Sequence, residues 1–434
     1  MSSTPPPHSA LPRQMVWVAG LLLLAKAIGA GKEVLLARAY GTGPLMDAYQ
    51  FTWQMASWPV SIFLAIGSAA LVPAYANLRT QSAQGLQAFR AQVHGATLAL
   101  AALLTLAWLA VCLWTPLLGS WSGLSDSARP LASALVLPMA VFMACGLYAA
   151  LLMAECISGQ HQASTLLEAA PAAVLATLLL ASAAPNTSTL QLGTVLGAVA
   201  QALALAAYTA WRMQLPRPSV RWRHSAWPPL LAALGTLVLA QLLQAATGVI
   251  DQFWAARAGQ GAVSVMGYAN RLLFLVLGLG SVVIARVLLP ALANLNAAQP
   301  AQARQLAHRW ALRLLGLGTL GVALLWPVSS WLVALLFERG AFAAQDTARV
   351  SAFLQLCWLQ VPTTLASLVL IQQVLAERRY RLLTLLAAVN LVVKLLGNGL
   401  LTPWLGLQGL ALASALMPLS TLLVLLWWWQ KPRP

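Results

Sequence analysis

The sequence has few charged residues, and acidic residues are especially scarce. Only 8% of its 434 residues are charged, and nine Asp and Glu stand against 25 Lys and Arg. Soluble domains carry about 25% charged residues, so this composition excludes an ordinary water-soluble domain. With 60% hydrophobic residues, we expect an all-α polytopic membrane protein. The basic residues are scattered between apolar stretches, so the net charge of +16 does not predict a nucleic-acid partner.

Residues that carry catalysis or bind metals are also lacking. The four cysteines, Cys112, Cys145, Cys156 and Cys357, lie inside apolar runs and have no metal-type spacing, which favours small buried side chains. The five histidines are scattered, and no Gly-rich loop followed by Lys-Ser or Lys-Thr is present. We therefore predict that the chain is not an enzyme and has no cofactor or resident metal.

Apolar runs long enough to cross a bilayer, roughly 20 residues each, recur along the chain. Residues 1–14, with three consecutive prolines, are predicted to be a disordered tail. The runs predict about twelve spans, at residues 15–40, 46–77, 92–118, 128–157, 163–184, 188–212, 226–256, 262–295, 305–336, 347–376, 381–402 and 405–429.

The positions of Lys and Arg predict the orientation of these spans. With the N-terminus in the cytoplasm, 15 Lys and Arg lie on the cytoplasmic side, four lie outside, and six lie within spans. This bias follows the positive-inside rule, so we expect both termini in the cytoplasm. The longest basic connection, at 213–225, divides the chain into an N-terminal lobe (15–212) and a C-terminal lobe (226–434) of six spans each.

Two sequence matches indicate that the chain is an internal duplication. The octapeptide LVPAYANL at 71–78 recurs as LLPALANL at 288–295, 217 residues later. Ala-Arg-Ala precedes a tyrosine at the same spacing in two places, and Arg38 and Tyr49 correspond to Arg257 and Tyr268 at an offset of 219. Because six spans is an even number, the repeats run in the same direction, and we expect a pseudo-twofold axis along the membrane normal.

Several charged residues lie deep within the predicted spans, where each costs at least about 2.5–3.5 kcal/mol. They are Lys26, Lys32, Glu33, Asp251, Arg271 and Lys394. The 219 offset places Lys32 at the position equivalent to Asp251. We hypothesise that these two opposite charges face one central cavity and compensate each other. The alternative is that each pairs within its own lobe.

Three further polar positions leave their role open. Asn390, Lys394 and Asn398 are spaced four residues apart, so they form a stripe that either hydrogen-bonds to neighbouring helices or lines a wet cavity. Asp47 begins the second span, where it is either a helix N-cap or a functional carboxylate. Glu155 lies near the end of its span, which favours a structural role.

Several stretches resemble the MurJ/MviN lipid II flippases of the multidrug/oligosaccharidyl-lipid/polysaccharide exporter superfamily. They are GKEVLLARAYGTG at 31–43, DAY at 47–49, YANRL at 268–272, LFERGAF at 336–342 and LGLQGLALA at 405–413. They follow the family's order along nearly the whole chain. The resemblance implies a MATE/MurJ-like fold with two lobes and alternating access.

The resemblance also implies a function and a site. The function is that of a flippase for a polyprenyl-pyrophosphate-linked glycan, lipid II or a related lipid-linked oligosaccharide, in the bacterial inner membrane. Lys26, Lys32, Arg271 and Asp47 would bind the substrate, and Glu33, Asp251 and Lys394 would balance charge or couple transport to H⁺, Na⁺ or the membrane potential. Family arginines correspond here to Lys26 and Lys32, which lack bidentate phosphate geometry. Family members have fourteen spans, against twelve here.

Two alternatives from other classes stay open. One is an ion-coupled drug or metabolite antiporter of the same superfamily, for which a cationic drug would need an acidic cavity. The other is a non-transporting membrane scaffold in envelope synthesis, which would have a tightly packed seam between its lobes. Whichever function holds, we expect a monomer that contacts membrane lipids.

Overall fold

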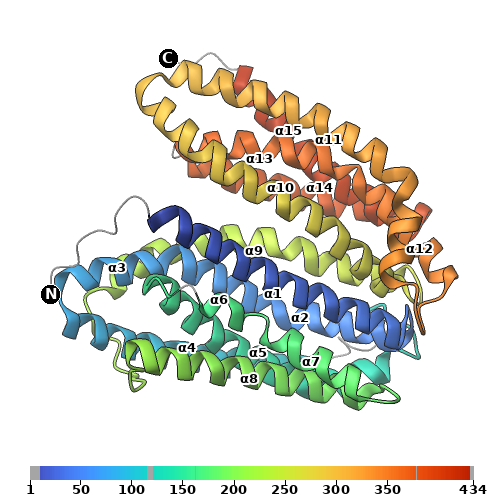
Figure 1. The fold of residues 1–434 in the computed structure, drawn as a ribbon, viewed down its shortest axis with the longest axis horizontal. Coiled ribbons are helices and arrows are strands. Elements are labelled where there is room, and N and C mark those ends of the chain that lie inside the picture. The colour runs from blue at the N-terminus through green and yellow to red at the C-terminus, as the bar shows by residue number, and fades with distance from the viewer. Residues whose placement is uncertain (1–9, 115–120, 162, 378, 431–434) are drawn as a thin grey trace. The chain divides into compact units, whose positions relative to one another are not determined.

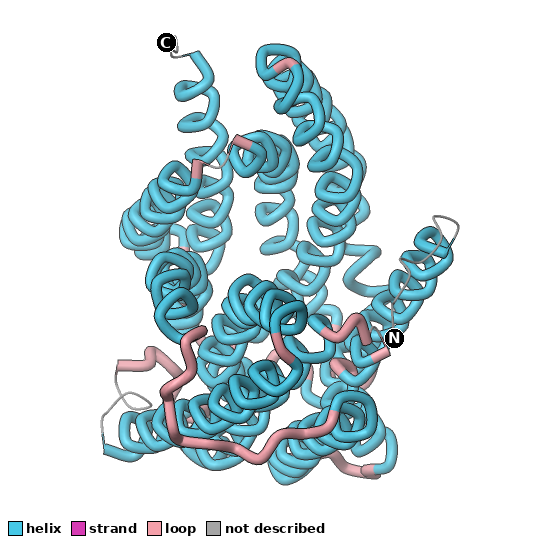
Figure 2. The backbone as a smooth tube through the Cα atoms, turned by 90° about the vertical axis from the view of Figure 1, so that its left-hand side faces the viewer, coloured by secondary structure: helices cyan, strands magenta, loops and turns pink. Residues whose placement is uncertain are grey.

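The computed structural model describes residues 10–114, 121–161, 163–377 and 379–430, and these are helical apart from connecting loops (Figure 2). The first half contains α1 (Ala10–Tyr40), α2 (Pro44–Ile66), the π-helix η1 (Gly67–Leu71), α3 (Val72–Gln81), α4 (Ala83–Trp114), α5 (Arg129–Ser158), α6 (Ser164–Leu167), α7 (Ala170–Ala181) and α8 (Thr187–Met213). The second half contains α9 (Trp227–Arg257), α10 (Ala262–Ala298), α11 (Pro300–Phe337), α12 (Ala344–Trp358), α13 (Gln360–Ala376), α14 (Tyr380–Leu405) and α15 (Leu407–Gln430).

Within the described ranges, each of the twelve predicted spans coincides with one helix or with consecutive helices, which confirms the predicted fold class. Among the described residues, eight segments are long and apolar enough to cross a membrane. The helix α1 has 31 residues, and at about 1.5 Å per residue it is also long enough. It begins at Ala10, five residues before the predicted span, so residues 10–14 of the predicted tail are helical; residues 1–9 lie outside the described part.

Proline explains where several predicted spans are divided. Pro171 lies in the first turn of α7, where its missing N–H removes no intrahelical hydrogen bond. Pro73 follows the π-helix η1. There the N–H of Val72 donates to the carbonyl of Gly67, five residues earlier, whereas in an α-helix it would donate to the carbonyl four residues earlier. A proline inside a continuous helix removes one hydrogen bond and crowds the preceding turn, so the wider π turn accommodates it.

One compact unit, unit 1, contains the described residues of 10–39, 52–121 and 129–241, which leave out 115–120 and 162. In it α5 packs against both α4 and α8, and α7 packs against α8 (Figure 1). Its buried apolar residues include Leu71, Tyr75 and Phe89, and the rings of Tyr75 and Phe89 are 6.0 Å apart edge to face. Leu230 of α9 belongs to the same core, and unit 1 includes the beginning of that helix, up to Gln241.

The second compact unit, unit 2, contains residues 40–51, 122–128 and the described part of 242–430. In it α13 packs against α10, α11 and α15, and α14 packs against α15. Its core contains Leu288 and Leu292, the counterparts of Leu71 and Tyr75 in the repeat. Both copies of the octapeptide thus place the same two positions in a hydrophobic core. The lobe boundaries at 212 and 226 stay a prediction.

Candidate functional site

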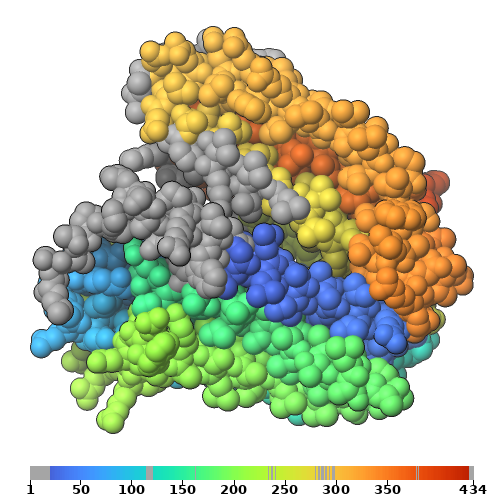
Figure 3. All heavy atoms as spheres, viewed as in Figure 1, coloured from blue at the N-terminus to red at the C-terminus, as the bar shows by residue number. Residues whose placement is uncertain are grey.

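The first two predicted substrate-binding residues lie on α1, in unit 1. Lys26 is exposed, and residues 20–40 form part of the molecular surface in the view of Figure 3. Lys32 is mostly buried; its Nζ atom lies 2.7 Å from Oε1 of Glu33 and 5.6 Å from the ring centroid of Trp53. Lys26 is therefore accessible, whereas Lys32 has a carboxylate partner and lies beside an aromatic ring.

The predicted charge-balancing residues of unit 2 form one buried cluster. The ammonium group of Lys394 lies 2.7 Å from Oδ1 of Asp251 and donates a hydrogen bond to the Ser414 hydroxyl. The side-chain amide of Asn398 donates to the same carboxylate oxygen at 3.2 Å. Lys394 is only 1% exposed, so an ion pair and two hydrogen bonds join α9, α14 and α15 in an apolar surrounding.

The stripe on α14 hydrogen-bonds to its neighbours, which was one of the two predicted roles. Besides Lys394 and Asn398, Asn390 accepts hydrogen bonds from Thr421 at 2.9 Å and from Ser420 at 3.3 Å, both on α15. All three residues of the stripe therefore contact α15 or α9.

The two charges predicted to meet across the lobes each have a partner within their own unit. Lys32 pairs with Glu33 in unit 1, and Asp251 pairs with Lys394 in unit 2. This matches the alternative that we stated for them. A direct meeting of Lys32 and Asp251 in another conformation stays a prediction.

Asp47 is a cap, but for a different helix from the one that contains it. It lies in the first turn of α2, yet its carboxylate accepts hydrogen bonds from the backbone N–H of Gly261 at 2.5 Å and of Ser264 at 2.8 Å. Both donors belong to the beginning of α10, whose first N–H groups have no intrahelical acceptor. The 3% exposed Asp47 thus joins the starts of two repeat-equivalent helices within unit 2.

Arg271, the remaining predicted substrate-binding residue, is exposed on α10 in unit 2. Of the three predicted pyrophosphate-binding cations, Lys26 and Arg271 are therefore exposed, and Lys32 is paired. Roles in substrate binding for these residues stay predictions.

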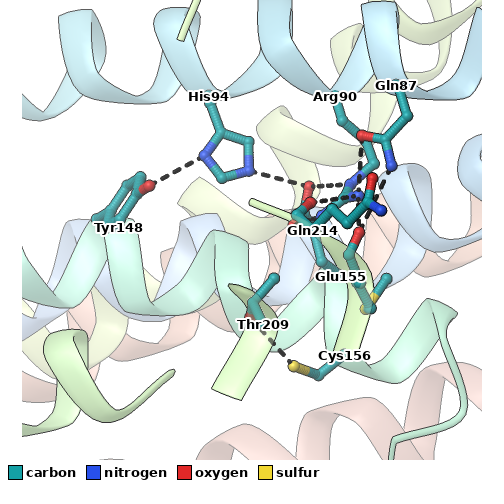
Figure 4. Close-up of polar contacts among 9 residues, drawn as sticks. Gln87, Arg90, His94, Tyr148, Glu155, Cys156, Thr209 and Gln214 are labelled. Carbon is teal, nitrogen blue, oxygen red and sulfur yellow. Dashed lines mark hydrogen bonds and ion pairs between the residues drawn. The ribbon is translucent and has the colours of Figure 1, made fainter. Parts of the chain in front are cut away.

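Sequence reasoning missed a buried ionic cluster in unit 1 (Figure 4). Both carboxylate oxygens of Glu155 bond to the Arg90 guanidinium, at 3.0 Å from Nε and 2.7 Å from Nη2. His94 Nε2 donates to Glu155 at 3.1 Å, and Nδ1 of the same ring is hydrogen-bonded to the Tyr148 hydroxyl at 3.0 Å. Glu155 and His94 are fully buried, so the four side chains join α4 and α5 by a continuous polar network.

The signal for this cluster is present in the sequence but weak. Arg90 and His94 are four residues apart, which puts them on the same face of a helix. The predicted span starts at residue 92, however, which leaves Arg90 outside it. The structure begins α4 at Ala83, because a polar helical turn can enter the protein interior when an acidic partner such as Glu155 is available.

The comparison with protein families gives a match over most of the chain. A family model described as lipid II flippase MurJ matches residues 36–433. A probable lipid II flippase MurJ from Rhizobium tropici is 26% identical, over 94% of this chain and 78% of the relative. A lipid II flippase MurJ from Burkholderia cenocepacia is 25% identical, over 92% of this chain and 80% of the relative.

Solved structures show the same fold. The inward closed conformation of a lipid II flippase MurJ superposes with a TM-score of 0.78 at 17% identity, covering 96% of this chain and 88% of the other. An inward-facing multidrug resistance transporter of the MATE family superposes with a TM-score of 0.74 at 14% identity, covering 94% and 93%. The fold is thus that of the superfamily that contains both groups. Because the family model covers most of the sequence, this chain belongs to the lipid II flippase MurJ family.

Proposed function

We propose that this protein moves a polyprenyl-pyrophosphate-linked glycan, lipid II or a related lipid-linked oligosaccharide, from the inner to the outer leaflet. The observation that carries the proposal is the family match over residues 36–433. Transport by alternating access of two lobes is consistent with the fold, since doubled membrane transporters bind their substrates between repeats.

The cations of α1 and α10 fit a pyrophosphate group. A cation in a low-dielectric surrounding acts strongly on an anion, and Lys26 and Arg271 are exposed within apolar helices. Lysine binds phosphate as a point charge, without the bidentate geometry of arginine. Lys32 is held by Glu33 at 2.7 Å, so an arriving pyrophosphate would exchange with Glu33 as its partner. This exchange keeps a mostly buried charge compensated before and after binding.

The proposal extends to location and energy source. The chain lies in the inner membrane of a bacterium with both termini in the cytoplasm, and the positive-inside bias of its Lys and Arg residues supports this orientation. Transport is driven by an H⁺ or Na⁺ gradient or by the membrane potential, and Glu33, Asp251 and Lys394 are the candidates for coupling or charge balance. The carrier works as a monomer.

The two alternatives predict different properties. An antiporter of cationic drugs needs acidic groups that are open to its substrate, whereas Asp251 is tied to Lys394 and Asn398. Lys26 and Arg271 are exposed and basic, which supports an anionic substrate. A scaffold would show no transport in purified form, so transport by the isolated protein separates it from a flippase.

Two measurements test the proposal. Expression in a lipid II flippase depletion strain should restore growth, and purified protein in proteoliposomes should expose labelled lipid II to an external modifying enzyme. Lys26→Ala, Lys32→Ala and Arg271→Ala should each lower the rate at equal expression, and Arg313→Ala, an exposed arginine of α11, is the control. If folded parent protein moves neither lipid II nor a shorter polyprenyl-pyrophosphate glycan, the function is wrong. If the three variants match the control, the site is wrong.

A further inference from the structure

The loop between α8 and α9, residues 214–226, is fastened to α4 rather than hanging free. It is the longest loop that is wholly described, and we call it the strap. At its start, the Arg90 guanidinium donates to the carbonyls of Met213 at 3.1 Å and Gln214 at 3.2 Å (Figure 4). In its middle, the N–H of Ser219 donates to the carbonyl of Ala91 at 2.8 Å.

The end of the strap is held by a single side chain of the same helix. The amide oxygen of Gln92 accepts from the backbone N–H of His224 at 3.2 Å and from the Trp227 indole at 2.9 Å. Gly95 lets the strap lie against α4, because a Cβ atom there would be 2.2 Å from the Ser219 carbonyl oxygen. The strap therefore has a defined conformation, with one side against α4 and one side turned outward.

The outward side combines large apolar residues with arginines. Val220 is 80% exposed and Trp222 is 59% exposed, and Trp211, in the last turn of α8, is 73% exposed. The exposed arginines on and beside the strap are Arg212, Arg217, Arg221 and Arg223. Trp222 also packs on Trp227 with ring centroids 5.9 Å apart, so its orientation is fixed by a residue that is itself hydrogen-bonded.

The charge on this surface has one sign. The sequence contains no Asp or Glu from residue 169 to residue 250. The buried Arg90 that anchors the strap is paired with Glu155, whereas the outward arginines lie in a segment without acidic residues. Partial burial and the nearby Arg212 and Arg79 lower the pKa of His161 in the loop after α5, which is consistent with a positive potential at this end of unit 1.

We propose that the strap is a docking surface for anionic phospholipid headgroups at the bilayer surface. The helix α8 is apolar and long enough to span the membrane, and it ends at Met213, so the strap begins where the hydrocarbon ends. Tryptophans concentrate at this level of a bilayer, and arginines beside a span attract anionic lipids, each strengthening the association about fivefold. Val220 and Trp222 would enter the interface while the arginines contact phosphates.

The apolar residues decide between a membrane and a soluble phosphate. A free anion would gain from the arginines alone, and exposed Val220 and Trp222 would contribute nothing to its binding. A lipid surface uses both kinds of residue, because apolar side chains contribute by burial in the interface. The proposal is independent of which glycan the protein moves.

The test uses the full-length protein in neutral detergent micelles, with phosphatidylglycerol or phosphatidylcholine added and bound lipid counted by native mass spectrometry. The strap variant is R217Q/R221Q/R223Q. The control, R309Q/R313Q/R381Q, removes three exposed arginines of unit 2. The parent should prefer phosphatidylglycerol, the strap variant should bind it on the order of 100-fold more weakly, and the control should resemble the parent. A parent without this preference, or equal losses in both variants, would overturn the proposal.

A second comparison separates the membrane surface from a simple phosphate site. V220S/W222S keeps every arginine and should also weaken binding of phosphatidylglycerol, while glycerol phosphate at millimolar concentration should not displace the lipid. If V220S/W222S binds as the parent does and glycerol phosphate displaces the lipid, the strap recognises phosphate alone and the membrane proposal is wrong. Thermal unfolding of each variant shows that the fold is kept, and the substituted side chains are all exposed.

Discussion

Asp47 caps α10 through Ser264, which donates to it twice. Its Oδ1 atom accepts from the Ser264 backbone N–H at 2.8 Å and from the Ser264 hydroxyl at 2.7 Å, and Oδ2 accepts from the Gly261 N–H at 2.5 Å. A helix normally receives its cap from the residue just before it. Gly261 occupies that position here with φ +81° and has no side chain that could accept a hydrogen bond. The cap is therefore Asp47, which precedes Ser264 by 217 residues.

We expect Asp47→Ala to destabilise unit 2 by about 2 kcal/mol or more. Removing a cap costs about 1–2 kcal/mol, and the two buried N–H groups of Gly261 and Ser264 would lose their acceptor. Asp47→Asn keeps one acceptor oxygen and should lie between the parent and Asp47→Ala. Thermal unfolding in detergent measures the order, with Glu168→Ala, an exposed carboxylate, as the control. Equal midpoints for Asp47→Ala and the control would show that the cap is not stabilising.

Removing Glu155 alone should destabilise the protein more than removing Glu155 and Arg90 together. Glu155→Leu leaves the Arg90 guanidinium buried without its carboxylate, and the loss of one partner from a buried ion pair costs about 3–5 kcal/mol. Arg90→Met with Glu155→Leu removes both charges and should recover part of this stability. Denaturant unfolding of the two single variants and the double variant gives the coupling energy. A double variant that loses the sum of the two single losses would show that the residues act independently.

The Asp251–Lys394 pair should respond in the same way, with an effect on transport as well. Asp251→Asn leaves a 1% exposed ammonium group with only hydrogen-bond partners, so we expect a loss of about 3–5 kcal/mol. Asp251→Lys with Lys394→Asp restores opposite charges to the pair, whose atoms lie 2.7 Å apart in the parent, and should rescue folding. Flipping in proteoliposomes then separates two roles. If folding is rescued and transport is not, transport depends on which helix carries the carboxylate and which carries the ammonium group.

Glu33→Gln should strengthen the binding of a pyrophosphate-bearing ligand. Glu33 holds the Lys32 ammonium at 2.7 Å, and a charge-assisted contact of this kind contributes about 1.5 kcal/mol, so its removal should tighten binding about tenfold. Tritiated short-chain polyprenyl pyrophosphate binding to purified protein measures this change, and Glu168→Gln is the control. Unchanged or weaker binding would mean that Lys32 does not exchange Glu33 for the ligand.

The sequence predicted the helices better than the partners of the charged residues. Hydropathy and span length located twelve spans because the thickness of the bilayer sets a similar minimum length for every apolar segment that crosses it. The partners of Lys32 and Asp251 depend on which helices are neighbours, and the repeat offset predicts equivalence rather than contact. The spacing from Asn390 and Asn398 singles out Lys394, but its pairing with Asp251 on α9 is visible only in the structure. Arg90 and Glu155 were missed for the same reason, since their 65-residue separation has no periodic signature.

The π-helical turn Gly67–Leu71 accounts for an irregularity in the duplication. Tyr49 and Leu71 are 22 residues apart, whereas their counterparts Tyr268 and Leu288 are 20 residues apart. The longer interval contains the π-helix, and the shorter one lies wholly within the regular α-helix α10. A π turn holds more residues than an α turn, so it takes up part of the additional chain while both octapeptides keep the same place in their cores. The widened turn thus lets two copies of unequal length bury the same positions.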